Sequence, residues 1–230
     1  MPSDSFPTCA ICPYDWPDRF CHNAKGKTQA NCPSVRLRGL AGSTMAITKS
    51  EENLEFARMA SLQETECYEG REDGYASLRP IKPRIVEIVE FARRMGYRRL
   101  GLAFCNGLRK EAAVVDQIFK TNGFETVSVT CKVGAADKSN LGLSADQQMD
   151  TTAERETMCN PILQAEIMNS MGTEFNVIMG LCVGHDSHFF KYAKAMGTVL
   201  AVKDRVLCHN PLAAIYQYDH FYRFLKKPLP

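Results

Sequence analysis

The sequence predicts an α/β fold, in which a doubly wound, Rossmann-like parallel sheet follows an N-terminal cysteine-rich metal-binding module. Three observations lead to this prediction. Four apolar runs of strand length alternate with helical segments in the second half of the chain. The chain holds ten cysteines, four of which lie in its loop-rich first 45 residues. Most of the others follow an expected strand or precede an expected helix, which indicates a ligand site.

The strands and helices begin to alternate near residue 81. An apolar helical face that starts at Ile81 stops at Gly96, a residue type that commonly ends helices. The runs predicted as buried strands cover residues 99–104, 126–130, 175–181 and 198–202. Helical segments are predicted at residues 107–122, 161–171, 187–196 and 211–225. This alternation favours a parallel sheet with helices on its faces.

Three regions are expected along the chain. Residues 1–45 have no sustained periodicity and form the cysteine-rich metal-binding module. Residues 46–80 form a helical connector, because Ser50 is a suitable N-cap for a helix with acidic residues in its first turn. Residues 81–230 form the α/β domain, with cysteines at the C-terminal edge of its sheet.

Composition excludes several classes of protein. The chain of 230 residues is 45% hydrophobic and 23% charged with a net charge of +2, which is typical of a globular protein and not of a disordered or nucleic-acid-binding one. No stretch has the charge and apolar pattern of a signal peptide, and none approaches the roughly 18 apolar residues of a membrane span. We therefore expect a cytoplasmic protein without membrane or nucleic-acid partners, whose thiols serve metal or redox chemistry.

The first group of cysteines has the spacing Cys9-x2-Cys12-x8-Cys21-x10-Cys32. A Cys-x2-Cys pair places two thiolates on one tight turn, and a second pair downstream can complete a tetrahedral site. The wide later spacing leaves zinc and an iron–sulfur cluster both open. Because this module has little apolar content, metal binding is expected to supply much of its folding free energy.

The second group is predicted to converge on one edge of the sheet. Cys105 and Cys131 directly follow expected strands, and Cys182 ends another. Cys159 precedes an Asn-Pro helix start, as does Cys208 before His209. Since parallel strands end at the same edge, the predicted iron–sulfur ligands are Cys105, Cys131, Cys159 and Cys182.

Charged residues near the same edge are candidates for substrate contact or proton transfer. Lys132 follows the second strand, His185 and Asp186 follow Cys182, and Asp204 follows the last strand. Lysines and arginines at positions 132, 138, 203 and 205 would offset a negatively charged cluster or bind a small anionic substrate.

A rival chemistry is indicated by the segment Gly180-Leu181-Cys182-Val183-Gly184, which matches a nucleophile elbow. Cys182, Asp204 and His209 follow the nucleophile, acid and base order of the α/β-hydrolases. The intervals between them are short for that fold, and a hydrolase leaves the other edge cysteines unexplained. A cysteine hydrolase therefore stays an alternative.

The motifs together resemble those of a known family. They are Cys9-Ala-Ile-Cys12, Asn31-Cys32-Pro33, Leu102-Ala-Phe-Cys105, Cys131-Lys-Val-Gly134, Cys159-Asn-Pro161, Gly180-Leu-Cys-Val-Gly-His-Asp186 and His209-Asn-Pro-Leu-Ala-Ala214. Nearly the whole chain resembles a prokaryotic domain-of-unknown-function family described as cysteine-rich metal-binding proteins, found mostly in anaerobic bacteria and archaea. The resemblance implies metal binding and no particular reaction.

The function expected from the sequence is iron–sulfur chemistry at the sheet edge, with a 4Fe-4S cluster there and zinc or a second iron–sulfur cluster at the N-terminal module. Such a protein would be an oxidoreductase or a desulfidase-type enzyme working with a redox partner or a small anionic substrate. A metal carrier or sensor without catalysis is the alternative from another class. The sequence leaves open the roles of Cys67 and Cys208 and the formation of a homo-oligomer.

Overall fold

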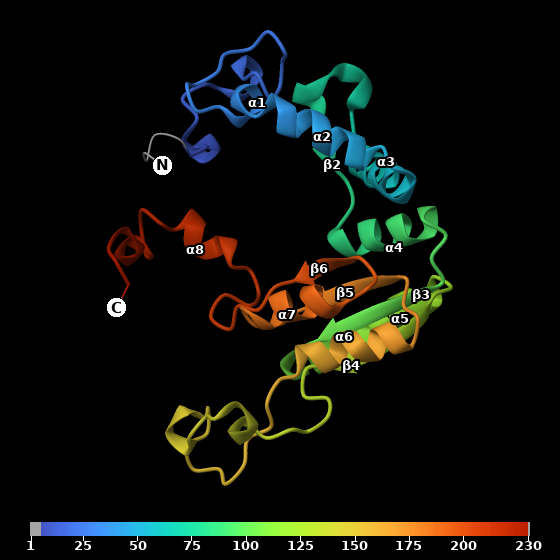
Figure 1. The fold of residues 1–230 in the computed structure, drawn as a ribbon, viewed down its shortest axis with the longest axis vertical. Coiled ribbons are helices and arrows are strands. Elements are labelled where there is room, and N and C mark those ends of the chain that lie inside the picture. Colours follow the sequence, from blue (N-terminus) through green and yellow to red (C-terminus); the bar gives the residue numbers. More distant parts are fainter. Residues whose placement is uncertain (1–5, 230) are drawn as a thin grey trace. The chain divides into compact units, whose positions relative to one another are not determined.

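The computed structural model describes residues 6–229 and shows two compact units, which meet between Glu64 and Thr65. We call residues up to Glu64 the N-terminal unit and residues from Thr65 the C-terminal unit. Figure 1 traces the elements of both units in chain order. All the strands of the described residues belong to the C-terminal unit.

The N-terminal unit consists of short turns followed by helices. Its elements are η2 (Cys9–Ile11), η3 (Trp16–Asp18), α1 (Pro33–Arg36), α2 (Arg38–Thr48) and α3 (Glu51–Thr65), the last of which runs one residue into the C-terminal unit. The helix expected after Ser50 is confirmed by α3. Helix α2 was not predicted, because its sequence is rich in Gly, Ser and Thr. The hydroxyls of Ser43, Thr44 and Thr48 donate to backbone carbonyls one turn earlier, which removes their usual competition with the helix.

The C-terminal unit is built on a four-stranded parallel sheet. Its strands are β3 (Arg99–Phe104), β4 (Glu125–Thr130), β5 (Phe175–Met179) and β6 (Gly197–Ala201), in the spatial order β4-β3-β5-β6. Each of the four predicted strands is present, within two residues at each end. A separate two-stranded antiparallel sheet pairs β1 (Tyr68–Glu69) with β2 (Arg79–Pro80), around the turns η4 (Arg71–Asp73) and η5 (Tyr75–Ser77).

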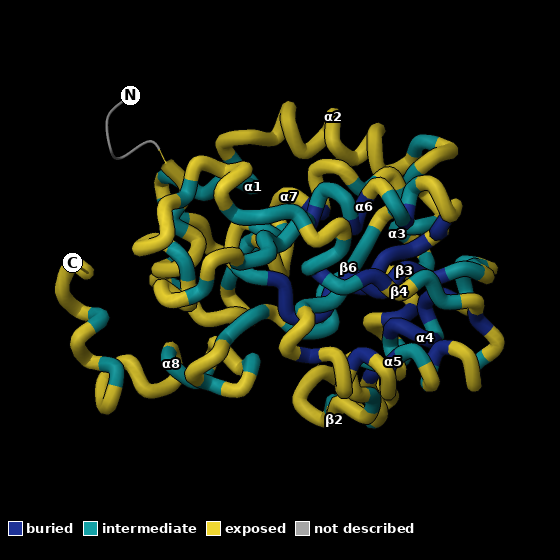
Figure 2. Tube along the Cα trace, turned by 90° about the horizontal axis from the view of Figure 1, so that it is seen from below, coloured by how far each residue is buried: buried dark blue, intermediate teal, exposed yellow. Residues whose placement is uncertain are grey.

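Helices cover both faces of the parallel sheet (Figure 2). On one face lie α4 (Arg84–Arg94) and α5 (Arg109–Thr121), and on the other lie α6 (Pro161–Ser170) and α7 (His185–Tyr192). The alternation of strand side chains explains the division: Phe175 of β5 contacts Phe91 of α4, whereas Ala103 and Ile178 pack with Met168 of α6 in the core of the opposite face. Short turns η6 (Asn106–Leu108), η7 (Lys138–Leu141) and η8 (Ala145–Gln147) complete this region.

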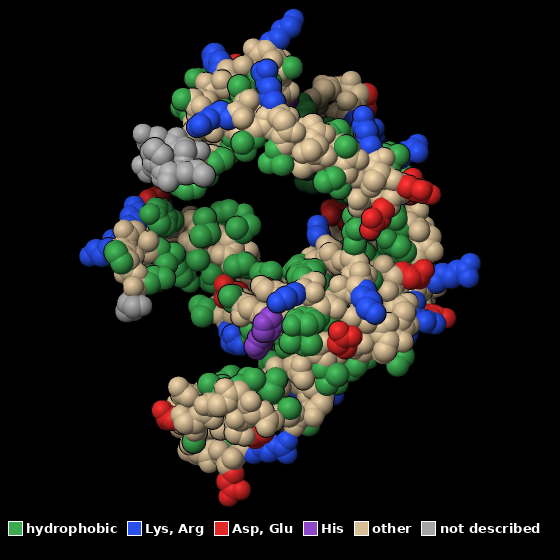
Figure 3. Space-filling model, in the orientation of Figure 1, with side chains coloured by type: hydrophobic (Ala, Val, Ile, Leu, Met, Phe, Trp, Pro, Cys, Tyr) green, Lys and Arg blue, Asp and Glu red, His purple; other side chains and the backbone are tan. Residues whose placement is uncertain are grey.

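The C-terminal segment differs from the prediction. The helix expected over residues 211–225 is broken into α8 (Leu212–Tyr216) and the turn η9 (Arg223–Lys226). Half of the six intervening residues are aromatic, namely Tyr218, Phe221 and Tyr222, and such side chains lose rotamer freedom in a helix. Large apolar side chains gather on this segment (Figure 3), among them the strongly exposed Phe221. Within residues 6–229, no helix combines the length and the apolarity that crossing a membrane requires.

Candidate thiol site at the carboxyl edge of the sheet

The strand order places the cysteines at the point where the direction of winding reverses. From β3 the chain crosses to β4 on one side and then returns to β5 on the other side of β3. Cys105 directly follows β3, and Cys131 directly follows β4. The carboxyl ends of strands at such a switch point form the crevice in which open α/β sheets bind ligands.

Cys131 lies at the centre of three neighbouring thiols, Cys105, Cys131 and Cys159, which we call the thiol cluster. The sulfurs of Cys131 and Cys159 are 3.6 Å apart. The Cys131 sulfur also interacts with the thiol of Cys105 and accepts the backbone N–H of Asn106 at 3.3 Å. Its side chain is 3% exposed and belongs to the hydrophobic core, against which Cys105 and Cys159 pack. The cluster is therefore held by the packed interior of the domain.

The backbone explains how Cys159 reaches Cys131 over 27 intervening residues. The backbone N–H of Asn160 donates to the carbonyl of Cys131 at 2.8 Å, and the Asn160 side chain caps α6 by accepting from Leu163 N. The Asn-Pro pair that was noted as a good helix start thus also joins this helix to the end of β4. The two cysteines are brought together by the same residue that begins the helix.

Because the three thiols of the cluster interact with one another, their pKa values differ. The thiol of Cys131 and burial raise the pKa of Cys105 to about 12. Hydrogen bonding with Cys131 and the positive charge of Lys132 lower the pKa of Cys159 to about 7. For Cys131, the bond with Cys105 lowers the pKa, but the bond with Cys159 together with burial outweighs it, so that this pKa is raised. Cys159 is therefore the first of the three to become a thiolate.

The thiol cluster has the donor chemistry of a soft metal site. Two sulfurs bound tetrahedrally to one zinc ion at 2.3 Å are separated by about 3.8 Å, close to the 3.6 Å between Cys131 and Cys159. A backbone N–H aimed at a sulfur, as from Asn106, is also typical of iron–sulfur ligands. Over residues 6–229, however, no three or more His, Cys, Asp or Glu side chains are already arranged as a set of metal ligands.

Cys182 lies three residues beyond β5, on a turn between two glycines with positive φ, Gly180 at 68° and Gly184 at 84°. These angles are ones that L side chains rarely adopt. The carbonyl of Cys182 accepts the first backbone N–H groups of α7, and Arg205 donates to its sulfur at 3.0 Å. Because it follows β5, Cys182 lies at the same carboxyl edge of the sheet as the thiol cluster, and its charge raises the pKa of Cys159.

Two of the predicted catalytic side chains face this edge. The Lys132 ammonium donates to the carbonyl of Thr157, and its charge acts on Cys159 and His185. His185, at the start of α7, is half-buried, and burial lowers its pKa below 6.5 despite the carboxylate of Asp186. The imidazole is therefore neutral at pH 7 and can accept a proton.

Asp204 and His209, the acid and the base of the alternative cysteine-hydrolase hypothesis, form hydrogen bonds with other groups. The Asp204 carboxylate accepts the backbone N–H groups of Val206 and Leu207, which folds the loop after β6. His209 Nδ1 accepts the backbone N–H of Asp204 at 3.2 Å. These contacts organise a loop and form no acid–base pair directed at Cys182. Lys138, which was expected near the edge, pairs with Glu156 at 2.6 Å instead.

Gln164 supports the strand ends at this site, and its role was not predicted from the sequence. Its side chain is fully buried in α6 and donates to the carbonyls of Val129 at 2.7 Å and Phe104 at 3.3 Å. These carbonyls lie at the ends of the two strands that carry Cys131 and Cys105. A glutamine among apolar residues in the segment Pro161-Ile-Leu-Gln-Ala was the available signal.

The N-terminal cysteines belong to the other unit. Asn31 donates to Phe6 O at 2.6 Å and to Thr8 Oγ1 at 3.0 Å, so that the residues preceding Cys9 and Cys32 are hydrogen-bonded to each other. Cys9 and Cys21 are exposed, and Cys12 and Cys32 are partly exposed. Their thiols are thus accessible to a metal ion, although no ligand set is preformed there.

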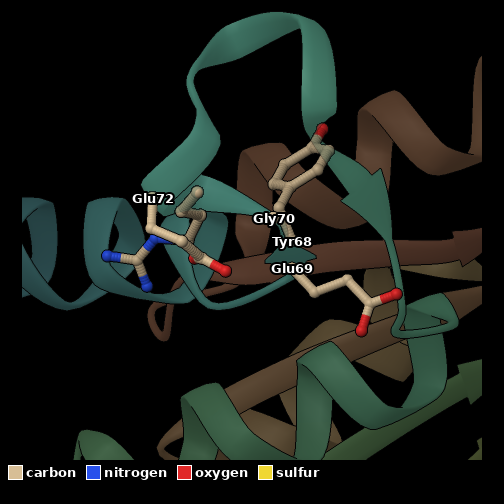
Figure 4. A pocket seen from close by; sticks show the side chains of 5 residues that line it. Tyr68, Glu69, Gly70 and Glu72 are labelled. Carbon is tan, nitrogen blue, oxygen red and sulfur yellow. The ribbon is translucent and has the colours of Figure 1, made fainter.

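An open pocket lies in the small antiparallel sheet, and no residue of the thiol cluster lines it. It is lined by Tyr68, Glu69, Gly70, Arg71 and Glu72, whose side chains are drawn in Figure 4. Its lining contains neither a cysteine nor a histidine, and its polar side chains are two acids, an arginine and a tyrosine. The pocket therefore adds nothing to the chemistry of the sheet edge.

The fold and the site define an α/β protein with cysteines gathered at the carboxyl edge of a parallel sheet. The chain belongs to the family described as "Protein of unknown function (DUF1847)", whose model matches residues 32–200. It is 42% identical over 178 residues to the uncharacterized protein MJ0455 of Methanocaldococcus jannaschii, an alignment that covers 77% of this chain and 84% of the relative. The range matched by the family model includes the thiol cluster and Cys182.

Proposed function

We propose that the protein is a metal-binding protein that holds an iron–sulfur cluster of the 4Fe-4S type at the carboxyl edge of a Rossmann-like, doubly wound sheet. The observation that supports this most is the interaction of Cys131, at the end of one parallel strand, with Cys105, at the end of the next strand, and with Cys159, which lies 3.6 Å away. Three thiols from three separate segments at a switch point are typical of a ligand site, because a core needs no such convergence.

The ligands in this proposal are Cys105, Cys131, Cys159 and Cys182. A cluster bound by them would supply one-electron transfer, or Lewis acidity at an iron that lacks a cysteine ligand. The protein would contribute the N–H of Asn106 and the guanidinium of Arg205, which stabilise negative charge on sulfur.

The reaction class we propose is redox or sulfur-handling chemistry. Neutral His185 would take up a proton near the thiols, while Lys132 would hold an anionic group by its charge. Asp186 adjoins His185 and raises its proton affinity. We also propose that Cys9, Cys12, Cys21 and Cys32 bind zinc or a second cluster, and that the protein works in the reducing cytoplasm.

The test is anaerobic purification followed by a visible absorption spectrum and by iron, zinc and sulfide analysis. We expect broad visible absorption, which bleaches on reduction, and acid-labile sulfide in proportion to iron. Cys131→Ser should remove both, whereas the matched variant Cys208→Ser, at an exposed thiol, should retain them. Full iron and sulfide in Cys131→Ser, or none in the native chain, would contradict the proposal.

A further inference from the structure

Lys203 follows β6 and places its ammonium at the switch point of the sheet. A Cβ atom on Gly107, in the turn after β3, would lie 3.9 Å from the ammonium nitrogen. A Cβ atom on Gly180, directly after β5, would lie 3.8 Å from the same nitrogen. The ammonium is therefore close to the backbone at the ends of both strands that border the reversal.

The space beside this ammonium is left open by a missing side chain. A Cβ atom on Gly107 would also lie 3.8 Å from the sulfur of Cys105. Both distances are ordinary van der Waals contacts, and Gly107 has no positive φ that would demand glycine. A side chain is therefore sterically possible at Gly107, and the glycine leaves a space of about one methyl group beside the thiol and the cation.

The cations at this edge are without carboxylate partners. Among residues 6–229, Lys203, Lys132 and Arg205 form no ion pair with an acid, whereas Lys82 and Lys138 each pair closely with a glutamate. Lys132 is directed at the Thr157 carbonyl, and Arg205 at the Cys182 sulfur. Lys203 interacts with the Cys105 thiol and has further ammonium protons to donate.

We propose that the space bordered by Gly107, the Cys105 sulfur and the Lys203 ammonium binds the carboxylate group of a small organic acid, with Lys203 as its counter-ion. This inference deepens the proposed function by naming the substrate class. The inference rests on the proposed function for the reaction that the bound acid would undergo. Binding of the acid itself requires no metal.

The number of available donors selects a carboxylate over a phosphate. A phosphate needs several donors around three oxygens, commonly arginine forks or a row of backbone N–H groups. Here the N–H of Gly107 already interacts with the Cys105 sulfur, and the guanidinium of Arg205 donates to the Cys182 sulfur. A single ammonium with spare donors matches a single negative charge.

The experiment is a titration of the isotope-labelled full-length protein with acetate, followed through the amide signals of Gly107 and Gly180, at constant ionic strength. Acetamide serves as the neutral probe and inorganic phosphate as the competing anion. We expect saturable shifts with acetate alone. Lys203→Met and Gly107→Ala should weaken acetate binding by about tenfold or more, since a charged hydrogen bond is lost or blocked.

Two variants serve as controls. Gly39→Ala adds a methyl group to a helix where nothing lies within 4 Å, and Lys110→Met removes an exposed charge of α5. Both should bind acetate as the native chain does. Native affinity in Lys203→Met, equal responses to acetate and acetamide, or a response to phosphate alone would overturn the inference. The proposed function can fail independently of this inference. In that case the purified native protein would contain no iron or sulfide but would still bind acetate.

Discussion

At the scale of single residues, the site depends on Cys131, which interacts with both other thiols of the cluster and is also part of the core. Its burial fixes the sulfur in position, while the N–H of Asn106 and the neighbouring thiols supply the polar contacts that a buried sulfur otherwise lacks. The same contacts lower the pKa of Cys159 and raise that of Cys105. Chemistry that needs a thiolate therefore starts at Cys159.

In the metal-free, reduced protein, Cys159 should react with iodoacetamide with a midpoint near pH 7, two units below the ordinary 9.0. Lys132→Met should move the midpoint upward, because a positive charge that stabilises the thiolate is lost. The measurement is the rate of alkylation at each cysteine, followed by mass spectrometry from pH 5 to 10. A midpoint near 9 for Cys159 in the native chain would contradict the assigned contact with Cys131.

The lowered pKa of Cys159 also makes the stability of the metal-free fold depend on pH. The folded pKa of Cys159 lies below its ordinary value, so this group stabilises the metal-free fold above pH 9, and the contribution is lost as the pH falls through about 7. Cys105 acts in the opposite sense. Its raised pKa stabilises the fold below pH 9, and the contribution is lost as the pH rises toward about 12.

Replacement of Gln164 should separate its role as a donor from its role in packing. Gln164→Leu keeps the volume but removes the donors to Val129 O and Phe104 O, so we expect a loss of about 1–2 kcal/mol in the free energy of unfolding. Gln164→Glu keeps the shape but places a carboxylate against two carbonyls, and it should cost more. Urea unfolding of the two variants measures both values. A more stable Glu variant would show that the amide does not donate to the strand ends.

At the scale of elements, the segment between β4 and α6 forms a lobe whose two ends lie close together (Figure 1). Cys131 and Cys159 lie at these ends, with their sulfurs 3.6 Å apart. Asp137 pairs with Thr157 in an antiparallel bridge, and Met158 N donates to Ala136 O at 2.8 Å. Lys138 and Glu156 form an ion pair at 2.6 Å whose side chains are 17% and 12% exposed. These contacts hold the two ends of the long segment between β4 and α6 close together.

Acidification should open this lobe before the domain unfolds. Lys138 lowers the pKa of Glu156 below 4.5, so the ion pair stabilises the lobe above that pH and is lost as the pH falls through the lowered value. Hydrogen exchange at the amide of Met158 should accelerate over the same range. Glu156→Gln should show fast exchange at every pH, whereas Asp219→Asn, at the exposed pair with Lys226, should behave like the native chain.

Some elements of the fold and the site could be predicted from the sequence, and others could not. The four strands were predictable because each is a short apolar run, and the cysteines at their ends followed from parallel topology. The breaks in the C-terminal helix and the formation of α2 depend on local competition between side chains and backbone, which apolar periodicity does not report. The contact of Arg205 with Cys182 and the loop role of Asp204 depend on loop geometry, which the residue types alone leave undetermined.

At the scale of the whole molecule, the ten cysteines are divided between two units. Cys9, Cys12, Cys21 and Cys32 lie in the N-terminal unit, and the thiol cluster, Cys182, Cys67 and Cys208 lie in the C-terminal unit. The thiol cluster is anchored in a hydrophobic core, whereas the described residues of the N-terminal unit include only one buried side chain, that of Gln63. The two groups of thiols should therefore differ in how far metal is needed for folding.

We predict that metal binding by the two groups is independent and has different structural consequences. In the full-length protein, Cys12→Ser should remove metal from the N-terminal unit and speed proteolysis within residues 6–48, because binding supplies folding free energy that its small core cannot. Iron and sulfide should be unchanged. Cys131→Ser should remove iron and sulfide but leave proteolysis of the N-terminal unit as it is. Metal analysis combined with limited proteolysis of both variants measures this, and loss of iron in Cys12→Ser would show that the two groups of cysteines act as one site.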